Sequence, residues 1–202
     1  MGTVFQTNPL NPQKRHILRV KEVLEAGGLV AYPTDSTYGI GCDLMNKRAI
    51  EKVYDLKKKD RKQPVSVICS DIKSLSRYAG VSNAAYRILK KHLPGPYTFI
   101  LPATPLIPKV MLTPRKTVGI RIPDNRIVQE IVEALGRPLI STSANLPDGT
   151  VLEDPYEIEE RYRGKIEIVI EGVCPGIPSA IIDLTEDEPI LIREGGRSVD
   201  WL

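Results

Sequence analysis

The sequence predicts an α/β fold built around a mixed β-sheet. Short apolar runs alternate with segments that carry apolar residues at helical spacing, which is typical of an α/β sheet. The end of the chain holds three strand-like runs with few helices between them, which favours some antiparallel pairing. With 202 residues and 42% hydrophobic content, the chain is long enough for one sizeable core. We therefore predict a single domain over 1–202.

Six segments predict helices. Apolar residues recur at helical spacing in 13–26, and a Gly27-Gly28 pair follows as a stop signal. Asp71 and Ser82 each precede a helix-like segment, and both side chains can accept hydrogen bonds from the first free N–H groups of a helix. The predicted helices cover 13–26, 46–57, 71–78, 82–92, 125–135 and 155–162.

Eight short apolar runs predict strands, and they cover 29–33, 65–69, 97–102, 117–122, 139–143, 166–170, 179–184 and 189–193. Segment 32–41 continues the first strand into a polar stretch that we interpret as a turn. Gly39 and Gly41 would let its backbone bend and let a ligand approach closely. We expect residues 1–11 and the last few residues to be loosely held, since chain termini usually are.

Two of these strands run from apolar residues into polar ones. The segments read Tyr32-Pro33-Thr34-Asp35-Ser36-Thr37-Tyr38-Gly39-Ile40-Gly41 and Pro138-Leu139-Ile140-Ser141-Thr142-Ser143-Ala144-Asn145. In an extended chain Ser141, Ser143 and Asn145 share one side. Because ligands of α/β sheets commonly bind beyond strand ends, the two segments predict one site built from both.

The basic residues suggest what this site binds. The net charge is only +3, so the whole chain is not basic enough to indicate nucleic acid by itself. The cations are unevenly spread, however, with the densest run at 57–62 and further clusters at 87–91 and 115–121. Together with hydroxyls and an amide they suit a phosphate-bearing ligand. If the clusters converge, they form a cationic concavity for ATP, RNA or both.

Several kinds of protein are disfavoured. The chain has no apolar run near 18 residues, so we expect no membrane span. The cysteines Cys42, Cys69 and Cys174 lie far apart without a C-x-x-C pair, which suits buried free thiols in a reducing, cytoplasmic setting. His16 and His92 lack neighbouring ligands, so we expect no protein-held metal. Magnesium would enter only with a nucleotide.

Six motifs in order resemble those of the YrdC/YciO family, which includes the threonylcarbamoyl-adenylate synthases. The patterns are P-T-[DE]-[ST]-x-Y-G-[LI]-G, P-G-P-x-T, V-x-x-R-x-P, S-x-N and a closing strand pair. They fall at 33–41, 94–98, 118–123, 143–145, 181–185 and 191–195. The resemblance implies a strongly twisted mixed parallel/antiparallel sheet curled around a cationic cleft, with helices packed outside. The likeness spans about residues 14–196, which it implies as the core of the single domain. Segments 94–101 and 193–195 look more like the YciO branch.

The resemblance implies a nucleotidyltransferase activity. L-threonine, bicarbonate or carbon dioxide, and ATP would give threonylcarbamoyl-AMP and pyrophosphate, for the threonylcarbamoyladenosine modification of tRNA with partner proteins. The residues implied to bind ATP are Lys57, Lys59, Arg61, Ser143, Asn145 and Arg193, and the catalytic ones among them are Lys57, Lys59, Ser143 and Asn145. The residues implied to bind threonine are Thr34, Arg121, Ser141 and Ser179.

Three positions depart from the synthase pattern and keep other functions open. Lys59 stands where Arg is usual, Asp60 where Pro is usual, and Ala180 where Thr is usual. One alternative is a protein of the same fold that binds tRNA or double-stranded RNA, or has a regulatory role. Another is a related carbamoyl or acyl-adenylate reaction with a different amino acid.

Overall fold

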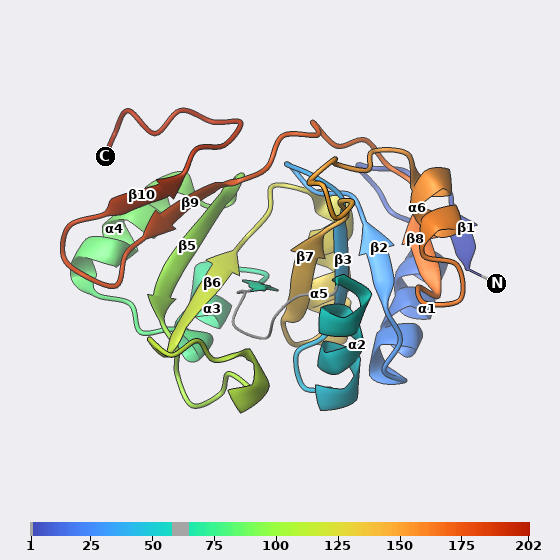
Figure 1. Cartoon of the computed structure of the whole chain (residues 1–202), viewed down its shortest axis with the longest axis horizontal. Helices are drawn as coiled ribbons and strands as arrows, with labels where there is room; N and C mark the ends of the chain where they lie inside the picture. Colours follow the sequence, from blue (N-terminus) through green and yellow to red (C-terminus); the bar gives the residue numbers. More distant parts are fainter. Residues whose placement is uncertain (1, 58–64) are drawn as a thin grey trace.

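The computed structural model describes residues 2–57 and 65–202, without the side chain of Lys57, and shows one ten-stranded sheet flanked by helices (Figure 1). The strands are β1 (Thr3–Phe5), β2 (Val30–Tyr32), β3 (Gly39–Asp43), β4 (Ser66–Ile68), β5 (Tyr97–Pro102), β6 (Thr117–Arg121), β7 (Leu139–Ser143), β8 (Ile168–Ile170), β9 (Ala180–Asp183) and β10 (Ile190–Arg193). The helices are α1 (Lys14–Glu25), α2 (Lys47–Lys57), α3 (Ile72–Tyr78), α4 (Asn83–His92), α5 (Arg126–Leu135) and α6 (Pro155–Arg161), with a short 3₁₀ turn η1 at Lys109–Met111.

The sheet is mixed, as the sequence predicts. Its strand order is β1-β8-β2-β3-β7-β4-β6-β5-β9-β10. The parallel pairs are β1–β8, β8–β2, β4–β6 and β5–β9. The antiparallel pairs are β2–β3, β3–β7, β7–β4, β6–β5 and β9–β10. The fold class expected from the family resemblance is thereby confirmed.

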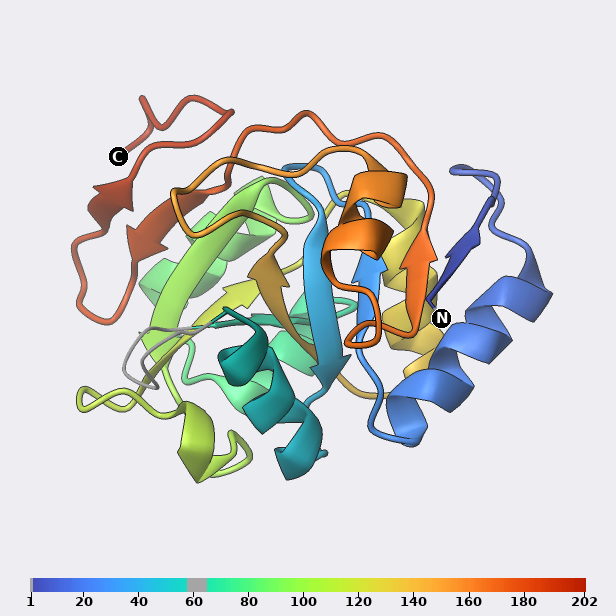
Figure 2. The ribbon, with the colours of Figure 1, turned by 45° about the vertical axis from the view of Figure 1, so that its right-hand side comes forward.

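Each face of the sheet packs against its own layer. Val30 and Tyr32 of β2 join a core with α1 and α5, whereas Leu29 and Ala31 join the other core, because alternate residues of a strand face opposite sides. Figure 1 shows α1 and α5 behind the sheet, and Figure 2 shows α2 and α6 in front of it with α1 at the right-hand side. Apolar residues of α2 and α6 belong to that second core. Among the described residues, no helix is long and apolar enough to cross a membrane.

Side-chain caps fix several helix ends. Asp71 accepts a hydrogen bond from the backbone N–H of Ser74 at 2.6 Å, and Ser82 accepts one from Ala85 at 3.1 Å. Gly136 ends α5 in the left-handed conformation with φ of 73°, which glycine adopts without steric cost. The caps at Asp71 and Ser82 lie where the sequence predicts them.

Two sequence expectations are wrong. Residues 3–5 are not a loose end: they form β1, which pairs in parallel with β8. Gly39 and Gly41 do not lie in a turn, because they belong to β3. A Cβ added at Gly39 would lie 2.7 Å from the ring of Tyr32, and one at Gly41 would lie 2.5 Å from the carbonyl oxygen of Ile140. The two glycines therefore make room for neighbouring protein atoms.

The C-terminal end also makes defined contacts. The ring of Trp201 stacks on His92, the last residue of α4, with ring centroids 4.0 Å apart. It also meets the ring of Tyr97 edge-on at 6.2 Å. These contacts attach the end of the chain to the start of β5, contrary to the expectation of a loose terminus.

Candidate substrate-binding cleft

A polar cleft of about 110 Å³ lies on the half of the sheet from β7 to β10. Its lining residues come from all six consecutive strands there, and from Val65 and Ser179, which immediately precede β4 and β9. Six lining residues carry hydroxyl groups, two are arginines and two are aliphatic: Ser66, Thr98, Ser141, Thr142, Ser143, Ser179, Arg121, Arg193, Val65 and Ile181. Since no carboxylate is among these described lining residues, the cleft suits an anionic ligand with several hydrogen-bonding groups.

Arg121, the last residue of β6, is the most buried cation of the cleft. One of its terminal nitrogens, Nη2, donates to Oδ1 of Asp35 at 2.9 Å and to Oγ of Ser36 at 2.8 Å. Its Nε is buried and has no hydrogen-bond partner among the described residues. Burial lowers the pKa of Arg121, and the charge of Asp35 opposes that shift. The guanidinium is thus held at one end and keeps an unused donor.

Arg193, at the end of β10, approaches the same cleft from the other side. Its Nε and Nη2 donate to the backbone carbonyl of Ser179 at 3.2 and 2.8 Å. Burial lowers the pKa of Arg193, and the positive charge of Arg121 lowers it further. An anion bound in the cleft would relieve the repulsion between the two guanidiniums.

The hydroxyl groups form their own contacts within this half of the sheet. The side-chain oxygens of Thr98 and Ser179 lie 2.8 Å apart, which joins β5 to the start of β9. Ser141 lies opposite Ser66 in the β4–β7 pair and opposite Gly41 in the β3–β7 pair. The strands therefore set the spacing of the hydroxyls along the cleft.

The turn between β2 and β3 holds Arg121, which lines the cleft. The Thr34 hydroxyl donates to the carbonyl of Thr37 at 2.7 Å and accepts from the backbone N–H of Ser36 at 3.1 Å. Thr34 is buried and is not among the residues that line the cleft. Thr34 therefore stabilises the turn whose Asp35 and Ser36 side chains accept hydrogen bonds from Arg121.

The structure brings five of the predicted site residues together in the cleft: Arg121, Ser141, Ser143, Ser179 and Arg193. Asn145 lies two residues beyond the end of β7 and does not line the cleft, although its backbone carbonyl accepts a hydrogen bond from the Tyr162 hydroxyl at 3.2 Å. Lys57 is the last residue of α2. Lys59 and Arg61 lie outside the described residues.

Sequence reasoning missed other residues of this region. Thr98 and Ser66 line the cleft and Asp35 holds Arg121, yet none was among the predicted ligands. Thr98 is the last residue of the P-G-P-x-T motif, and Ser66 is a polar residue between two apolar residues of a predicted strand. These two signals were visible in the sequence. The Asp35–Arg121 contact joins positions 86 residues apart, so only the fold reveals it.

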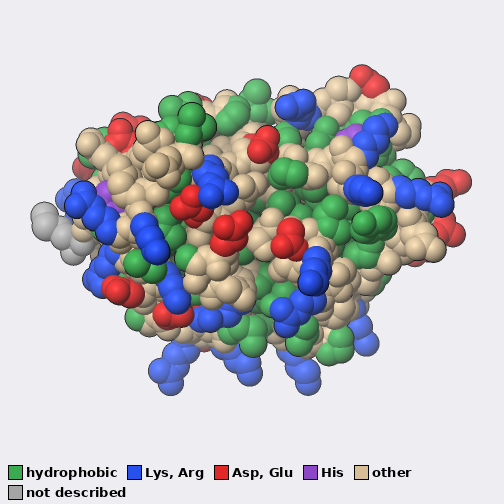
Figure 3. Space-filling model, turned by 180° about the vertical axis from the view of Figure 1, so that it is seen from behind, with side chains coloured by type: hydrophobic (Ala, Val, Ile, Leu, Met, Phe, Trp, Pro, Cys, Tyr) green, Lys and Arg blue, Asp and Glu red, His purple; other side chains and the backbone are tan. Residues whose placement is uncertain are grey.

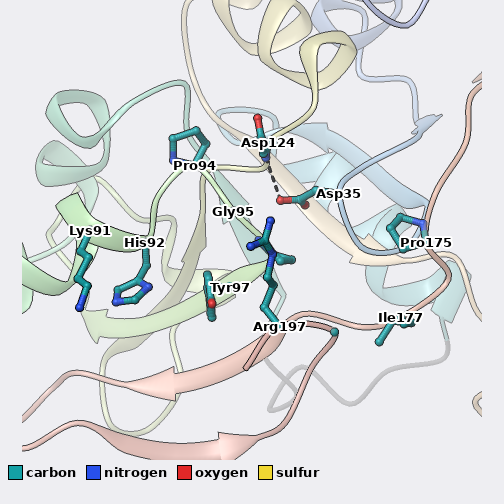
Figure 4. Close-up of a pocket in the computed structure, with 12 residues that line it drawn as sticks. Asp35, Lys91, His92, Pro94, Gly95, Tyr97, Asp124, Pro175, Ile177 and Arg197 are labelled. Carbon is teal, nitrogen blue, oxygen red and sulfur yellow. Dashed lines mark hydrogen bonds between the residues drawn. The ribbon is translucent and has the colours of Figure 1, made fainter. Parts of the chain in front are cut away.

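A second, larger cavity of about 380 Å³ lies on the other side of Asp35 (Figure 4). Its charged side chains are Asp35, Asp124, Lys91 and Arg197, so both signs are equally present. Figure 4 shows Arg197 directed toward Asp35 and Asp124 between the start of β5 and the segment at Pro175. A balanced set of charges attracts a polyanion less than the two arginines of the cleft do.

The chain was compared with known proteins. The family model Sua5/YciO/YrdC, described as "Telomere recombination", matches residues 22–195. YciO of Escherichia coli is 40% identical over 96% of each chain, and a crystal structure of E. coli YciO superposes with a TM-score of 0.94 at 39% identity, covering 99% of this chain and 98% of that one.

Two matches from Pyrococcus abyssi carry the name of an activity or of a ligand. A threonylcarbamoyl-AMP synthase of Pyrococcus abyssi is 31% identical over 88% of this chain, which spans 53% of that relative's length. The structure of P. abyssi Sua5 complexed with L-threonine has a TM-score of 0.89 at 28% identity, with 96% of this chain and 58% of that one covered. On these matches, the chain belongs to the Sua5/YciO/YrdC family.

Proposed function

We propose that this protein synthesises threonylcarbamoyl-AMP from L-threonine, bicarbonate or carbon dioxide, and ATP. The observation that carries the proposal is the pair of guanidiniums, Arg121 and Arg193, in a hydroxyl-lined cleft without carboxylates among its described lining residues. The relatives named threonylcarbamoyl-AMP synthase, and the threonine complex of a protein with the same fold, support it. The product would serve the threonylcarbamoyladenosine modification of tRNA.

The amino acid would bind at the Arg121 side of the cleft. A carboxylate needs charged donors, and Nε of Arg121 is a buried donor without a partner in the part of the chain that the structure describes. Ser141 and the Thr98–Ser179 pair would bind the remaining polar groups of threonine. Thr34 would act here through the turn that holds Ser36.

The nucleotide would bind at the Arg193 side. Arg193, Ser143 and Asn145 would hold its phosphates, and Lys57, Lys59 and Arg61 would neutralise the pyrophosphate. Magnesium would arrive with ATP, since the described lining residues are donors to anions rather than oxygen ligands of a metal.

The chemical step needs alignment and charge neutralisation. A carbamate oxygen of N-carboxy-threonine attacks the α-phosphorus of ATP, a new P–O bond forms, and the bond to the β-phosphate oxygen breaks with release of pyrophosphate. The nucleophile comes from the substrate, so the protein needs no activated Ser or Cys of its own. Its contribution is to hold the reacting atoms in line and to stabilise charge that develops on the phosphates.

Pyrophosphate release tests the proposal. The purified protein is incubated with magnesium and ATP, and L-threonine or bicarbonate is omitted in turn. Release that requires both compounds supports the synthase. Release that proceeds equally with another amino acid points to related chemistry in the same cleft. No release from folded protein with any amino acid contradicts the proposal.

Binding of structured RNA without turnover is the second candidate. The favouring observation is the exposed cationic surface at the end of α4, with Arg87, Lys90 and Lys91. On the face drawn in Figure 3, however, Lys and Arg side chains are interspersed with Asp and Glu. RNA binding would weaken steeply with salt, because bound phosphates release counterions. Affinity for structured RNA that stays constant between low and high salt would exclude it.

A further inference from the structure

The carboxylate of Asp35 lies between the cleft and the second cavity. Its Oδ1 accepts a hydrogen bond from Nη2 of Arg121, which lines the cleft. Asp35 itself lines the cavity of about 380 Å³, where Figure 4 shows it beside Asp124. The side chains of Asp35 and Arg121 are each only 9% exposed. The ion pair therefore joins a residue that lines the cleft to a residue that lines the second cavity.

Asp35 is itself held in place. Its Oδ2 accepts a hydrogen bond from the backbone N–H of Asp124 at 2.9 Å, next to the start of α5. Burial raises the pKa of Asp35, while the charge of Arg121 and the backbone donor oppose the shift. A backbone group thus orients the carboxylate, and the carboxylate in turn orients the guanidinium.

The donors of Arg121 are divided between protein and cleft. Nη2 carries two hydrogens, and its two acceptors are Asp35 and Ser36, at 2.9 and 2.8 Å. That end of the guanidinium is fully used by the protein. Because the group is planar and rigid, fixing Nη2 also fixes the directions of Nε and Nη1. Neither of these two nitrogens donates to a described residue, and Nε is buried.

We propose that Asp35 is a positioning residue, which together with Ser36 aims the free donors of Arg121 at the carboxylate of the substrate. Asp35 does not touch the substrate; it acts through Arg121. The identity of that anion as L-threonine rests on the proposed function, whereas the orientation of Arg121 does not. A pair that served only to neutralise a buried charge would leave the substrate affinity of folded protein unchanged.

The first test is the Asp35→Ala variant, with the KM for L-threonine measured at saturating ATP. We expect the KM to rise about tenfold to a hundredfold, the size of one charge-assisted contact, with a smaller change in kcat. Added formate should restore the KM in a saturable manner, because the second cavity opens onto the place of the lost carboxylate.

Asp43→Ala is the matched control. Asp43 is a buried carboxylate that pairs with the partly exposed Arg137 at 2.6 Å, and it lines neither cavity. Its loss should lower stability without changing the KM for L-threonine, and formate should have no effect on that KM. A folded Asp35→Ala protein whose KM stays within twofold of wild type, or does not respond to formate, would overturn the proposal.

An activity-independent measurement separates this proposal from the proposed function. The ¹H–¹⁵N NMR signal of Arg121 Nε reports how well its side chain is fixed. We expect a sharp signal in wild type, a broadened one in the isosteric Asp35→Asn variant, and recovery with formate in Asp35→Ala. A wild type without threonine-dependent turnover would defeat the proposed function alone, whereas an Nε signal unchanged by both variants would defeat the positioning role.

Discussion

At the residue scale, the cleft depends on two guanidiniums whose charges the protein only partly compensates. Within the described ranges, Arg121 pairs with one carboxylate, that of Asp35, and Arg193 donates to a neutral carbonyl. A hydrogen bond to a charged group contributes about 1.5–3 kcal/mol, which corresponds to roughly tenfold to a hundredfold in affinity or rate. An anionic substrate thus gains from contacts that the free protein leaves incomplete.

Removing the charge of Arg193 should slow pyrophosphate release. Arg193→Gln should lower threonine-dependent pyrophosphate release about tenfold to a hundredfold, because the nucleotide phosphates lose a charged donor. Arg115→Gln is the control, since Arg115 pairs with Asp183 and does not line the cleft. Turnover of the control should stay within twofold of wild type. Equal losses in both variants would show that the effect is not local to the cleft.

The lowered pKa of Asp183 predicts that this residue stabilises the fold in a pH-dependent way. Burial raises its pKa, but hydrogen bonds from Thr185 and the charge of Arg115 outweigh burial, and the net shift is downward. A lowered pKa in the folded state stabilises the fold above the unfolded value of about 3.9, and the gain is lost as the pH falls through the folded value.

Asp183→Asn should therefore cost about 1–2 kcal/mol of unfolding free energy at pH 7, and less as the pH falls below about 4. Urea unfolding at a series of pH values measures this. Asp187→Asn, at an exposed position in the β9–β10 connection, serves as control. A cost for Asp183→Asn that is the same at pH 7 and pH 3 would contradict the account.

At the element scale, helix ends are set by single residues. Gly136 ends α5 with a positive φ and has no atom within 4 Å of an added Cβ. Gly136→Ala should destabilise the protein by about 1 kcal/mol through backbone strain alone. Gly80→Ala is the control, because its φ is ordinary and its added Cβ would meet Pro102 at 3.6 Å. A Gly136 variant as stable as the Gly80 variant would contradict this explanation.

The sequence predicts the helices well because their signals are local. Asp71, Ser82 and Gly136 act within three or four residues of where they stand. The strands β1 and β3 could not be predicted in this way. β1 is a strand because it pairs with β8, more than 160 residues away. The glycines of β3 are typical of a turn in the sequence, and only the folded structure shows that the ring of Tyr32 packs against them.

The residues of the candidate site show the same difference between local and long-range signals. Strand alternation placed Ser141 and Ser143 on the cleft, and the family resemblance implied that Arg121 binds threonine, whose carboxylate is an anion. The sequence could not say that the first anion is the protein's own Asp35, or that Thr98 meets Ser179 across 81 residues. Contacts of this range depend on strand order, which local patterns do not encode.

At the scale of the whole molecule, the two halves of the sheet contribute to the cleft in different ways. The strands β1, β8, β2 and β3 carry none of the cleft's lining residues, which all come from β7 onward in the sheet or from the residues just before β4 and β9. The first half contributes the turn after β2, whose Asp35 and Ser36 hold Arg121. The cleft therefore depends on both halves although only one lines it.

A ligand that binds only the folded cleft should stabilise the whole molecule. Inorganic pyrophosphate at about 100 times its Kd should add about 2.7 kcal/mol to the unfolding free energy and raise the Tm. Arg193→Gln should lose most of this increase, whereas Arg115→Gln should keep it. Thermal unfolding at several pyrophosphate concentrations measures the shift, and an increase that survives in the Arg193 variant would place the anion elsewhere.

The location of bound L-threonine tests the central claim most directly. A crystal structure of the protein with L-threonine should show its carboxylate within hydrogen-bond distance of Arg121 in the cleft, with polar groups near Ser141 and Ser179. Threonine bound instead in the cavity of Asp124 and Arg197, or absent from a cleft that is open in the crystal at saturating concentration, would contradict the account.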